Sequence, residues 1–168
     1  MAKTKKNIKV ERLEFGTGLC VLEPEWDALL EQSSRPTIFS SFDFVYISCL
    51  HFKQEEEIFF LFFRDAANDE LLAIFPMSLN KERPYGIGIQ ALAHGITTVG
   101  TDVDKPYPII RQDCERICWQ RFRDYFHKEF RQWDVIDYDE FMPESHLHGS
   151  LKSLFPFPGY WTKVTPGP

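Results

Sequence analysis

The residues best suited to chemistry gather in one polar stretch, residues 94–108. Its hydroxyl, carboxylate and ring side chains belong to His94, Thr97, Thr98, Asp102, Asp104 and Tyr107. Side chains of these types can hydrogen-bond a sugar or an amine. A long connection in a compact domain usually either carries function or lacks order. These six residues are therefore candidates for binding a small polar molecule, and a plain surface loop is the other interpretation.

Two other groups contain residue types that ligate metals. His146 and His148 are close to several acids in the sequence, but side chains two positions apart on a helix point in different directions. Cys114 and Cys118 share a helical face, yet zinc would need two further ligands and His127 lies on another stripe. We predict core packing for these cysteines and no metal site. No spacing indicates a nucleophile–base pair or an acid–base pair of carboxylates.

Composition narrows the classes of partner. The chain has 168 residues, which suits one domain, and a net charge of −6. An acidic balance disfavours nucleic acid and anionic membranes, because both are bound through clustered Lys and Arg. The longest apolar run, residues 58–63, is too short to span a bilayer, and the basic opening lacks the apolar run of a secretory signal. We expect a cytoplasmic protein.

Hydrophobic periodicity indicates the elements that position these residues. Strands are predicted within 8–22 and at 58–63, 71–79, 87–93, 135–138 and 160–165, with helices after Pro24, at 40–52, at 113–131 and from Pro143. Ser40 and Asp113 are the expected helix caps. Pro76 indicates a bulge or an edge position in its strand. Residues 1–165 form one predicted domain, and 166–168 are the start of a linker or tail.

Three phrases carry a resemblance to a known family. They are LEPEWDALLEQSSRPTIFSSFDFV at 22–45, LLAIFPMSL at 71–79 and WDVIDYDEFMPES at 133–145. In this order they resemble the N-terminal half of GNAT-type proteins, namely the acetyltransferase-like proteins linked to bacterial cellulose biosynthesis and the Fem-type aminoacyltransferases. The resemblance implies an α/β (α+β) GNAT-like fold. Its mixed central sheet would have about six strands with helices on both faces, and the final strand would be missing.

The resemblance also implies a function. In such families a second GNAT half usually carries the acyl-donor site, while the N-terminal half helps to hold the acceptor. The chain would then be the acceptor-side, structural half of an enzyme that moves an acyl group from a thioester to an amine or hydroxyl of a sugar or amino-acid-like acceptor. Its partner would be a second GNAT-like domain, of the same parent chain or another, or a second copy docked at the exposed sheet edge.

The acyl-donor site is the point on which the alternatives divide. GNAT enzymes hold the diphosphate of coenzyme A on backbone N–H groups at a helix start, with the letters Gln/Arg-x-x-Gly-x-Gly/Ala. Arg83, Gly86 and Gly88 match those letters, but only about seven helical residues could follow them. The longest predicted helix begins without glycine and with the acids Asp113 and Glu115, which repel phosphate.

We therefore expect no cofactor in this chain, with acetyl-CoA or another acyl donor belonging to the complete enzyme. Two alternatives stay open. One is a self-sufficient N-acetyltransferase that binds acetyl-CoA through residues 83–88. The other is a non-enzymatic protein-binding module that uses the fold for interaction alone.

Overall fold

Two strands buried on both faces form the centre of the fold. The computed structural model describes residues 7–16, 18–52, 57–80, 91–94, 108–137 and Ser153. β2 (Glu57–Asp65) and β3 (Leu71–Asn80) pair antiparallel, and their described side chains are buried from 58 to 65 and from 71 to 79. Their continuous apolar sequence predicts this double coverage.

The other strands extend this pair on both sides. β1 (Ile8–Glu14) pairs antiparallel with β2, and β4 (Ala91–His94) pairs antiparallel with β3. β5 (Ile109–Ile110) also pairs with β3, and β6 (Val135–Asp137) pairs parallel with β4. The sheet order is β1-β2-β3-β4-β6, with β5 beside β3. The predicted mixed sheet is confirmed. β5 was not predicted, and the strand predicted at 160–165 lies outside the described residues.

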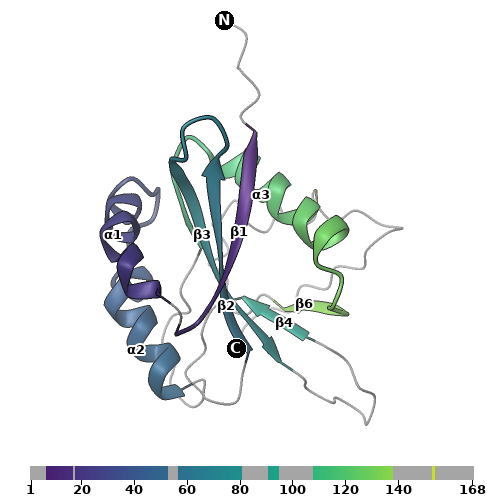
Figure 1. Ribbon diagram of the computed structural model, residues 1–168, viewed down its shortest axis with the longest axis horizontal. Coiled ribbons are helices and arrows are strands. Elements are labelled where there is room, and N and C mark those ends of the chain that lie inside the picture. The colour runs from purple at the N-terminus through teal and green to yellow at the C-terminus, as the bar shows by residue number, and fades with distance from the viewer. Residues whose placement is uncertain are drawn as a thin grey trace, which may run out of the picture.

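Helices cover both faces of the sheet, as predicted. α1 (Glu23–Glu31) and α2 (Phe42–Phe52) lie on one face, and α3 (Glu115–Asp124) lies on the other and continues into a π-helical turn at Tyr125–Glu129 (Figure 1). Short 3₁₀ turns at Leu19–Leu22 and Ile38–Ser40 precede α1 and α2. None of the helices in the described part of the chain is long and apolar enough to cross a membrane. The helix predicted from Pro143 lies outside the described residues, apart from the helical Ser153.

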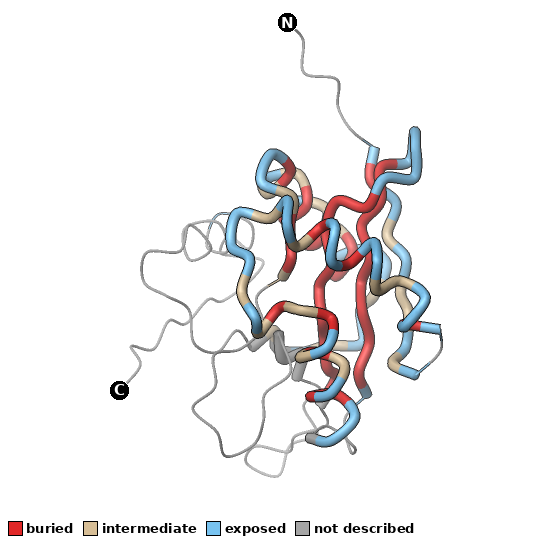
Figure 2. The backbone as a smooth tube through the Cα atoms, turned by 90° about the vertical axis from the view of Figure 1, so that its left-hand side faces the viewer, coloured by how far each residue is buried: buried red, intermediate tan, exposed pale blue. Residues whose placement is uncertain are grey.

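Each face of the sheet has its own aromatic core. Phe59, Leu61 and Phe63 of β2 pack with α3, whereas the alternating Phe60 and Phe62 pack with α1 and α2. The red stretches in Figure 2 show how burial concentrates along the central strands, while the helices alternate between buried and exposed positions. The period-2 alternation of a strand thus divides one apolar run between two cores.

Trp26 anchors the core under α1 and α2. It is fully buried, and its ring meets Phe42, Phe60 and Phe62 at edge-to-face angles. Its Nε1–H donates to the carbonyl oxygen of Ser40 at 2.9 Å. Burial therefore leaves the indole N–H satisfied and ties α1 to the start of α2.

Three predictions about helix residues are wrong in detail. The side chain that caps α2 is Ser41, whose Oγ accepts from the Phe44 N–H at 3.4 Å, and not Ser40, which is buried. Asp113 does not cap α3; the cap position is Cys114, and Asp113 pairs with an arginine instead. The helical spacing of Leu50 from Tyr46 predicts that it shares the apolar face of α2, but Leu50 is 47% exposed.

Pro76 forms neither a bulge nor an edge position. It pairs with Phe60 inside the ladder between β2 and β3, and the register shift lies at Phe63/Arg64. Its nitrogen points away from β2, toward the side of β3 that pairs with β4 and β5. On that side, pairing with β4 ends at Met77 and pairing with β5 begins at Ile74. A residue without an N–H therefore occupies one of the two positions of β3 between these pairings, 75 and 76, that have no strand partner on this side among the described residues.

Candidate functional site

The candidate site lies beside β3, at the gap between the two short strands β4 and β5 that pair with it. β4 and β5 pair with different parts of the same edge of β3, and residues 95–107 between them lie outside the described residues. Of the polar residues predicted to hold an acceptor, His94 has its backbone in β4, opposite Met77. Thr97, Thr98, Asp102, Asp104 and Tyr107 lie outside the described residues, so their role stays a prediction.

The glycine-containing segment also lies beyond what the structure describes. Arg83, Gly86 and Gly88 belong to residues 81–90, and His146 and His148 belong to 138–152. The structure therefore does not test either group. The structure does describe the other candidate for donor binding, the start of α3, in detail.

Backbone hydrogen bonds hold the turn between β5 and α3 against two other segments, β3 and the end of α1. The Arg111 N–H donates to the Leu72 carbonyl of β3 at 3.0 Å, and the Gln112 N–H donates to the Gln32 carbonyl at the end of α1 at 3.2 Å. Within the turn, the Cys114 N–H donates to the Arg111 carbonyl at 2.9 Å. Three of the amides that lead into α3 are thus already paired with protein carbonyls.

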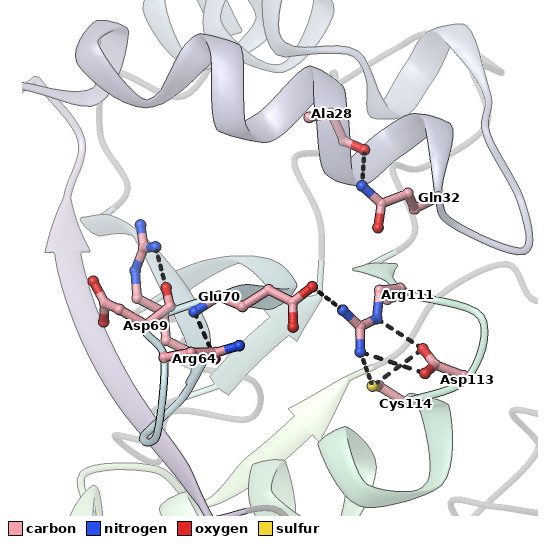
Figure 3. A network of polar contacts seen from close by, with 9 residues as sticks. Ala28, Gln32, Arg64, Asp69, Glu70, Arg111, Asp113 and Cys114 are labelled. Carbon is pink, nitrogen blue, oxygen red and sulfur yellow. Dashed lines mark hydrogen bonds and ion pairs between the residues drawn. The ribbon is translucent and has the colours of Figure 1, made fainter.

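The Arg111 side chain holds the same turn through ion pairs with two carboxylates. Figure 3 shows its guanidinium between Glu70, from the turn after β2, and Asp113. Nη1 pairs with Glu70 Oε1, and Nε pairs with Asp113 Oδ1 at 2.7 Å. Burial alone would lower the pKa of Arg111, but hydrogen bonds with Asp113 and Cys114 outweigh it and hold that pKa above its usual value.

Acids surround the start of α3. The hydrogen bond from Arg111 lowers the pKa of Asp113, which keeps this carboxylate ionised. Glu115 is the first residue of the helix, and its Oε1 accepts from the hydroxyl of Ser34. Negative charge suits the positive end of a helix dipole, so these acids stabilise α3. They also occupy the region where an anionic ligand would approach the helix.

Cys114 and Cys118 pack into the core beneath this turn, as predicted. They are 1% and 0% exposed and contact the aromatic core on the α3 side. Burial and a hydrogen bond to Asp113 raise the pKa of the Cys114 thiol, which disfavours the reactive thiolate. Among the described residues, no group of histidines, cysteines and acids is arranged to hold a metal ion.

Comparison with solved structures identifies the fold. No protein family profile and no curated protein matches the sequence. The structure is similar to that of an aminoglycoside acetyltransferase from an uncultured soil metagenomic sample. The match covers 95% of this chain and 93% of that one, at 7% identity and a TM-score of 0.52. It is also similar to aminoglycoside 6′-N-acetyltransferase AAC(6′)-Ih from Acinetobacter baumannii, with 95% and 99% covered, 10% identity and a TM-score of 0.50.

The chain adopts the GNAT fold. The predicted GNAT-like arrangement is therefore confirmed at the level of fold. At identities of 7% and 10% the likeness extends no further, and the finer resemblance to the cellulose-associated and Fem-type proteins stays a prediction.

The sequence predicts no diphosphate-binding site at the start of α3, and the geometry of that turn can be compared with what a diphosphate needs. A diphosphate needs N–H groups that point at it and a backbone it can approach closely. Residues 109–115 contain no glycine, and the N–H groups of Arg111, Gln112 and Cys114 are already paired. Asp113 and Glu115 add two negative charges, and Arg111 is engaged by carboxylates. The missing glycine and the two acids therefore disfavour a diphosphate at this turn.

Arg111 and β5 are the parts of the site that sequence reasoning missed. The stretch 94–108 was predicted as one irregular section, although Ile109 and Ile110 after it are buried and paired with β3. The available signal was local: two β-branched apolar residues followed by an arginine and, two positions later, an acid. The partner Glu70 lies 41 positions away in the sequence, and no local pattern indicates it.

Proposed function

We propose that the chain is the acceptor-side, structural half of a GNAT-type acyltransferase. In this proposal a second GNAT-fold domain holds an acyl thioester. The domain described here presents an amine or a hydroxyl of a small acceptor, to which the acyl group is transferred. A partner domain of this kind can belong to the same parent protein or to another chain.

The start of α3 is the observation that supports this division of labour. A GNAT-fold domain that bound its own donor would need free amides and little negative charge at that turn. Here the turn has paired amides, Asp113, Glu115 and an arginine already bonded to two carboxylates. Diphosphate binding would have to break the Arg111–Asp113 pair and overcome repulsion from Glu115.

The proposed acceptor is a sugar or a related amine. The polar stretch from His94 to Tyr107 begins at the end of β4, which pairs in parallel with β6. The metagenomic acetyltransferase of similar fold was solved in complex with sisomicin and with trehalose. Hydroxyl-rich and amine-rich molecules of this type suit the hydroxyls and carboxylates of the stretch.

Isothermal calorimetry separates this proposal from a self-sufficient enzyme. We expect no heat of binding when acetyl-CoA or coenzyme A is titrated into the chain at up to millimolar concentration. Binding at micromolar concentration would overturn the proposal. A parallel titration with trehalose and an aminoglycoside tests the acceptor half, and the Asp102→Ala/Asp104→Ala variant should weaken any binding observed.

The alternative of a self-sufficient N-acetyltransferase is favoured by one observation, the match over nearly the whole length of both acetyltransferase chains. In that case the diphosphate would bind at residues 83–88. Coenzyme A binding that is lost in Gly86→Val and retained in Asp113→Ala would support this alternative. Coenzyme A binding that is retained in Gly86→Val and becomes tighter in Asp113→Ala would assign the diphosphate to the start of α3 and contradict both readings.

A further inference from the structure

The outer edge of β1 presents a row of backbone groups that point away from the sheet. β1 and β2 keep one register from Ile8↔Asp65 to Glu14↔Phe59. The bonds that flank this ladder, Ala66 N–H to Asn7 O at 2.8 Å and Phe15 N–H to Ile58 O at 3.0 Å, both use odd-numbered residues of the first strand. In an antiparallel ladder inward and outward residues alternate, so Ile8, Val10, Arg12 and Glu14 direct their N–H and C=O groups outward.

A contact from α3 supports this assignment independently. Arg121 Nε donates to the Ile8 carbonyl oxygen at 3.0 Å, which requires that oxygen to point away from β2. No partner is recorded within the described part of the chain for the backbone groups of Val10 and Arg12. β1 is the end strand of the sheet order, on the side opposite β6, and can be followed in Figure 1. An unpaired edge of this kind accepts another strand.

We propose that β1 pairs antiparallel with β1 of a second copy of this chain, about a two-fold axis at Val10. Two-fold symmetry closes the assembly, because each copy uses the same edge. The sheets of the two copies would join into one continuous sheet through the outward groups of Ile8, Val10 and Arg12. The Ile8 carbonyl oxygen, which accepts from Arg121, would accept a second hydrogen bond from the Arg12 N–H of the other copy. This proposal goes beyond the proposed acyl transfer and does not depend on it.

Charge selects this register among the possible ones. Two-fold pairing of three or more outward residues is possible with the axis at Val10, at Glu11 or at Arg12. An axis at Glu11 or Arg12 places that residue opposite its own copy, and like charges directly opposite are unfavourable. An axis at Val10 places Lys9 opposite Glu11 of the second copy, twice, and puts the two valines in contact.

The strand already carries the corresponding pair within one copy. Lys9 Nζ lies 3.0 Å from Glu11 Oε1, and both side chains are about half exposed, at 42% and 53%. In the dimer these two residues and their counterparts form a square of alternating charge on the α1/α2 face of the sheet. Charges on an edge strand often prevent association. Here their spacing is complementary to a second copy in this register.

Cysteine cross-linking tests the register directly. Residues opposite each other in a hydrogen-bonded pair have Cα atoms about 5.5 Å apart, within the range that a disulfide spans. In a Cys20→Ser background, which removes the exposed native thiol, Val10→Cys should form a covalent dimer on mild oxidation. The matched variant Glu11→Cys should not, because its neighbour in the second copy is Lys9. Cross-linking of Glu11→Cys in place of Val10→Cys would overturn the proposal.

Sedimentation of the unmodified chain tests the assembly itself. We expect a dimer that dissociates on dilution, and Val10→Pro should shift it to monomer. The proline removes only an outward N–H, so the circular dichroism spectrum should not change. Val10→Thr keeps that N–H and should stay dimeric. If Val10→Pro fails to fold, Glu11→Lys replaces two attractive cross-strand pairs by repulsive ones and should weaken the dimer on the order of tenfold.

Three outcomes would contradict the proposal. The first is an unmodified chain that stays monomeric at the highest attainable concentration. The second is a folded Val10→Pro variant that stays dimeric, which would place the interface elsewhere. The third is a monomer whose Val10 amide is protected from hydrogen exchange, which would mean that another segment of the same chain covers the edge.

Discussion

Arg111 shows how much of this fold depends on one side chain. Its guanidinium is 14% exposed and bonds Glu70 from the β2–β3 turn and Asp113 from the start of α3. Its backbone N–H bonds Leu72 of β3. One residue therefore holds the end of β5, the β2–β3 turn and the first turn of α3 together. The flat, five-donor guanidinium allows it to reach two carboxylates at once.

Arg111→Lys should destabilise the chain although the charge is kept. An ammonium group cannot reproduce both bonds of the guanidinium fork. Because both carboxylates are partly exposed, we expect a loss of about 1 kcal/mol in the free energy of unfolding. Urea denaturation measures it, with Arg116→Lys at an exposed position of α3 as the matched control. Equal stability of the two variants would show that the fork is not needed.

Asp113 should make stability depend on acid. The Arg111 hydrogen bond holds the pKa of Asp113 below its ordinary value of 3.8. A lowered pKa in the folded state means that its stabilisation is complete above the ordinary value and is lost as the pH falls through the lowered one.

The test is the unfolding free energy measured from pH 7 down to pH 3. Asp113→Asn should be less stable than the unmodified chain at pH 7, and the difference should shrink below about pH 4. The side chain is 68% exposed, so salt should reduce the effect. Asp124, whose pKa is also lowered through its bond with Arg123, keeps part of the acid dependence in the variant. A difference that stays constant across this range would contradict the assignment.

At the scale of elements, a buried arginine joins α1 to the sheet. Arg64 near the end of β2 is 6% exposed, and its Nη1 lies 2.8 Å from Glu25 Oε2 of α1. The same nitrogen donates to the Asp69 carbonyl oxygen at 3.0 Å. Asp69 adopts a positive φ of 63°, so the turn after β2 is shaped around this guanidinium.

Removing only one partner of this pair should cost more than removing both. Glu25→Ala leaves a buried guanidinium without its nearest carboxylate, and we expect a loss of about 1–3 kcal/mol. Arg64→Met with Glu25→Ala replaces the charge by an apolar chain and should recover part of that loss. Denaturant midpoints of the two single variants and the double variant form the cycle that measures the coupling. Additive losses would mean that the pair does not couple α1 to β2.

The sequence predicts the strands and helices well and their ends less well. The apolar run at 58–63 allows only a buried strand, and Pro24 with the spacing of Trp26 and Leu29 indicates α1. Two adjacent serines at 40 and 41 offer nearly equal caps, and the choice depends on burial of Ser40, which is a tertiary property. Asp113 is an equally good local cap, but Arg111 competes for its carboxylate.

The candidate site is predictable only in part for a similar reason. The absence of glycine and the presence of acids at the start of α3 can be recognised in residues 110–115. The paired amides cannot, because their acceptors are carbonyls of Leu72 and Gln32, which come from β3 and from the end of α1. Pro76 gives the complementary case. The sequence shows that Pro76 lacks an N–H. It does not show whether the proline nitrogen points toward β2 or toward the edge of β3 that pairs with β4 and β5.

At the scale of the whole molecule, the sheet couples two cores that share no helix. Trp119 of α3 packs on Phe75 in one core, and Trp26 of α1 packs on Phe60 in the other. β2 contributes alternate residues to both, so neither core can open without exposing strands on which the other depends. The expected behaviour is a single cooperative unfolding transition.

Two tryptophan reporters test this coupling. In one variant Trp26 is the sole tryptophan and in the other Trp119 is, with the remaining tryptophans changed to Phe in each. Within each variant, the fluorescence transition in urea should have the same midpoint as the transition followed by circular dichroism. Replacing Trp26 by Phe removes the hydrogen bond to the Ser40 carbonyl and should cost about 1–3 kcal/mol in the free energy of unfolding. The two variants should therefore differ in stability, and the test is the agreement of the two probes within each variant. A fluorescence transition that precedes the loss of circular dichroism in either variant would show that its core opens alone. The sheet would then support two separately folding halves.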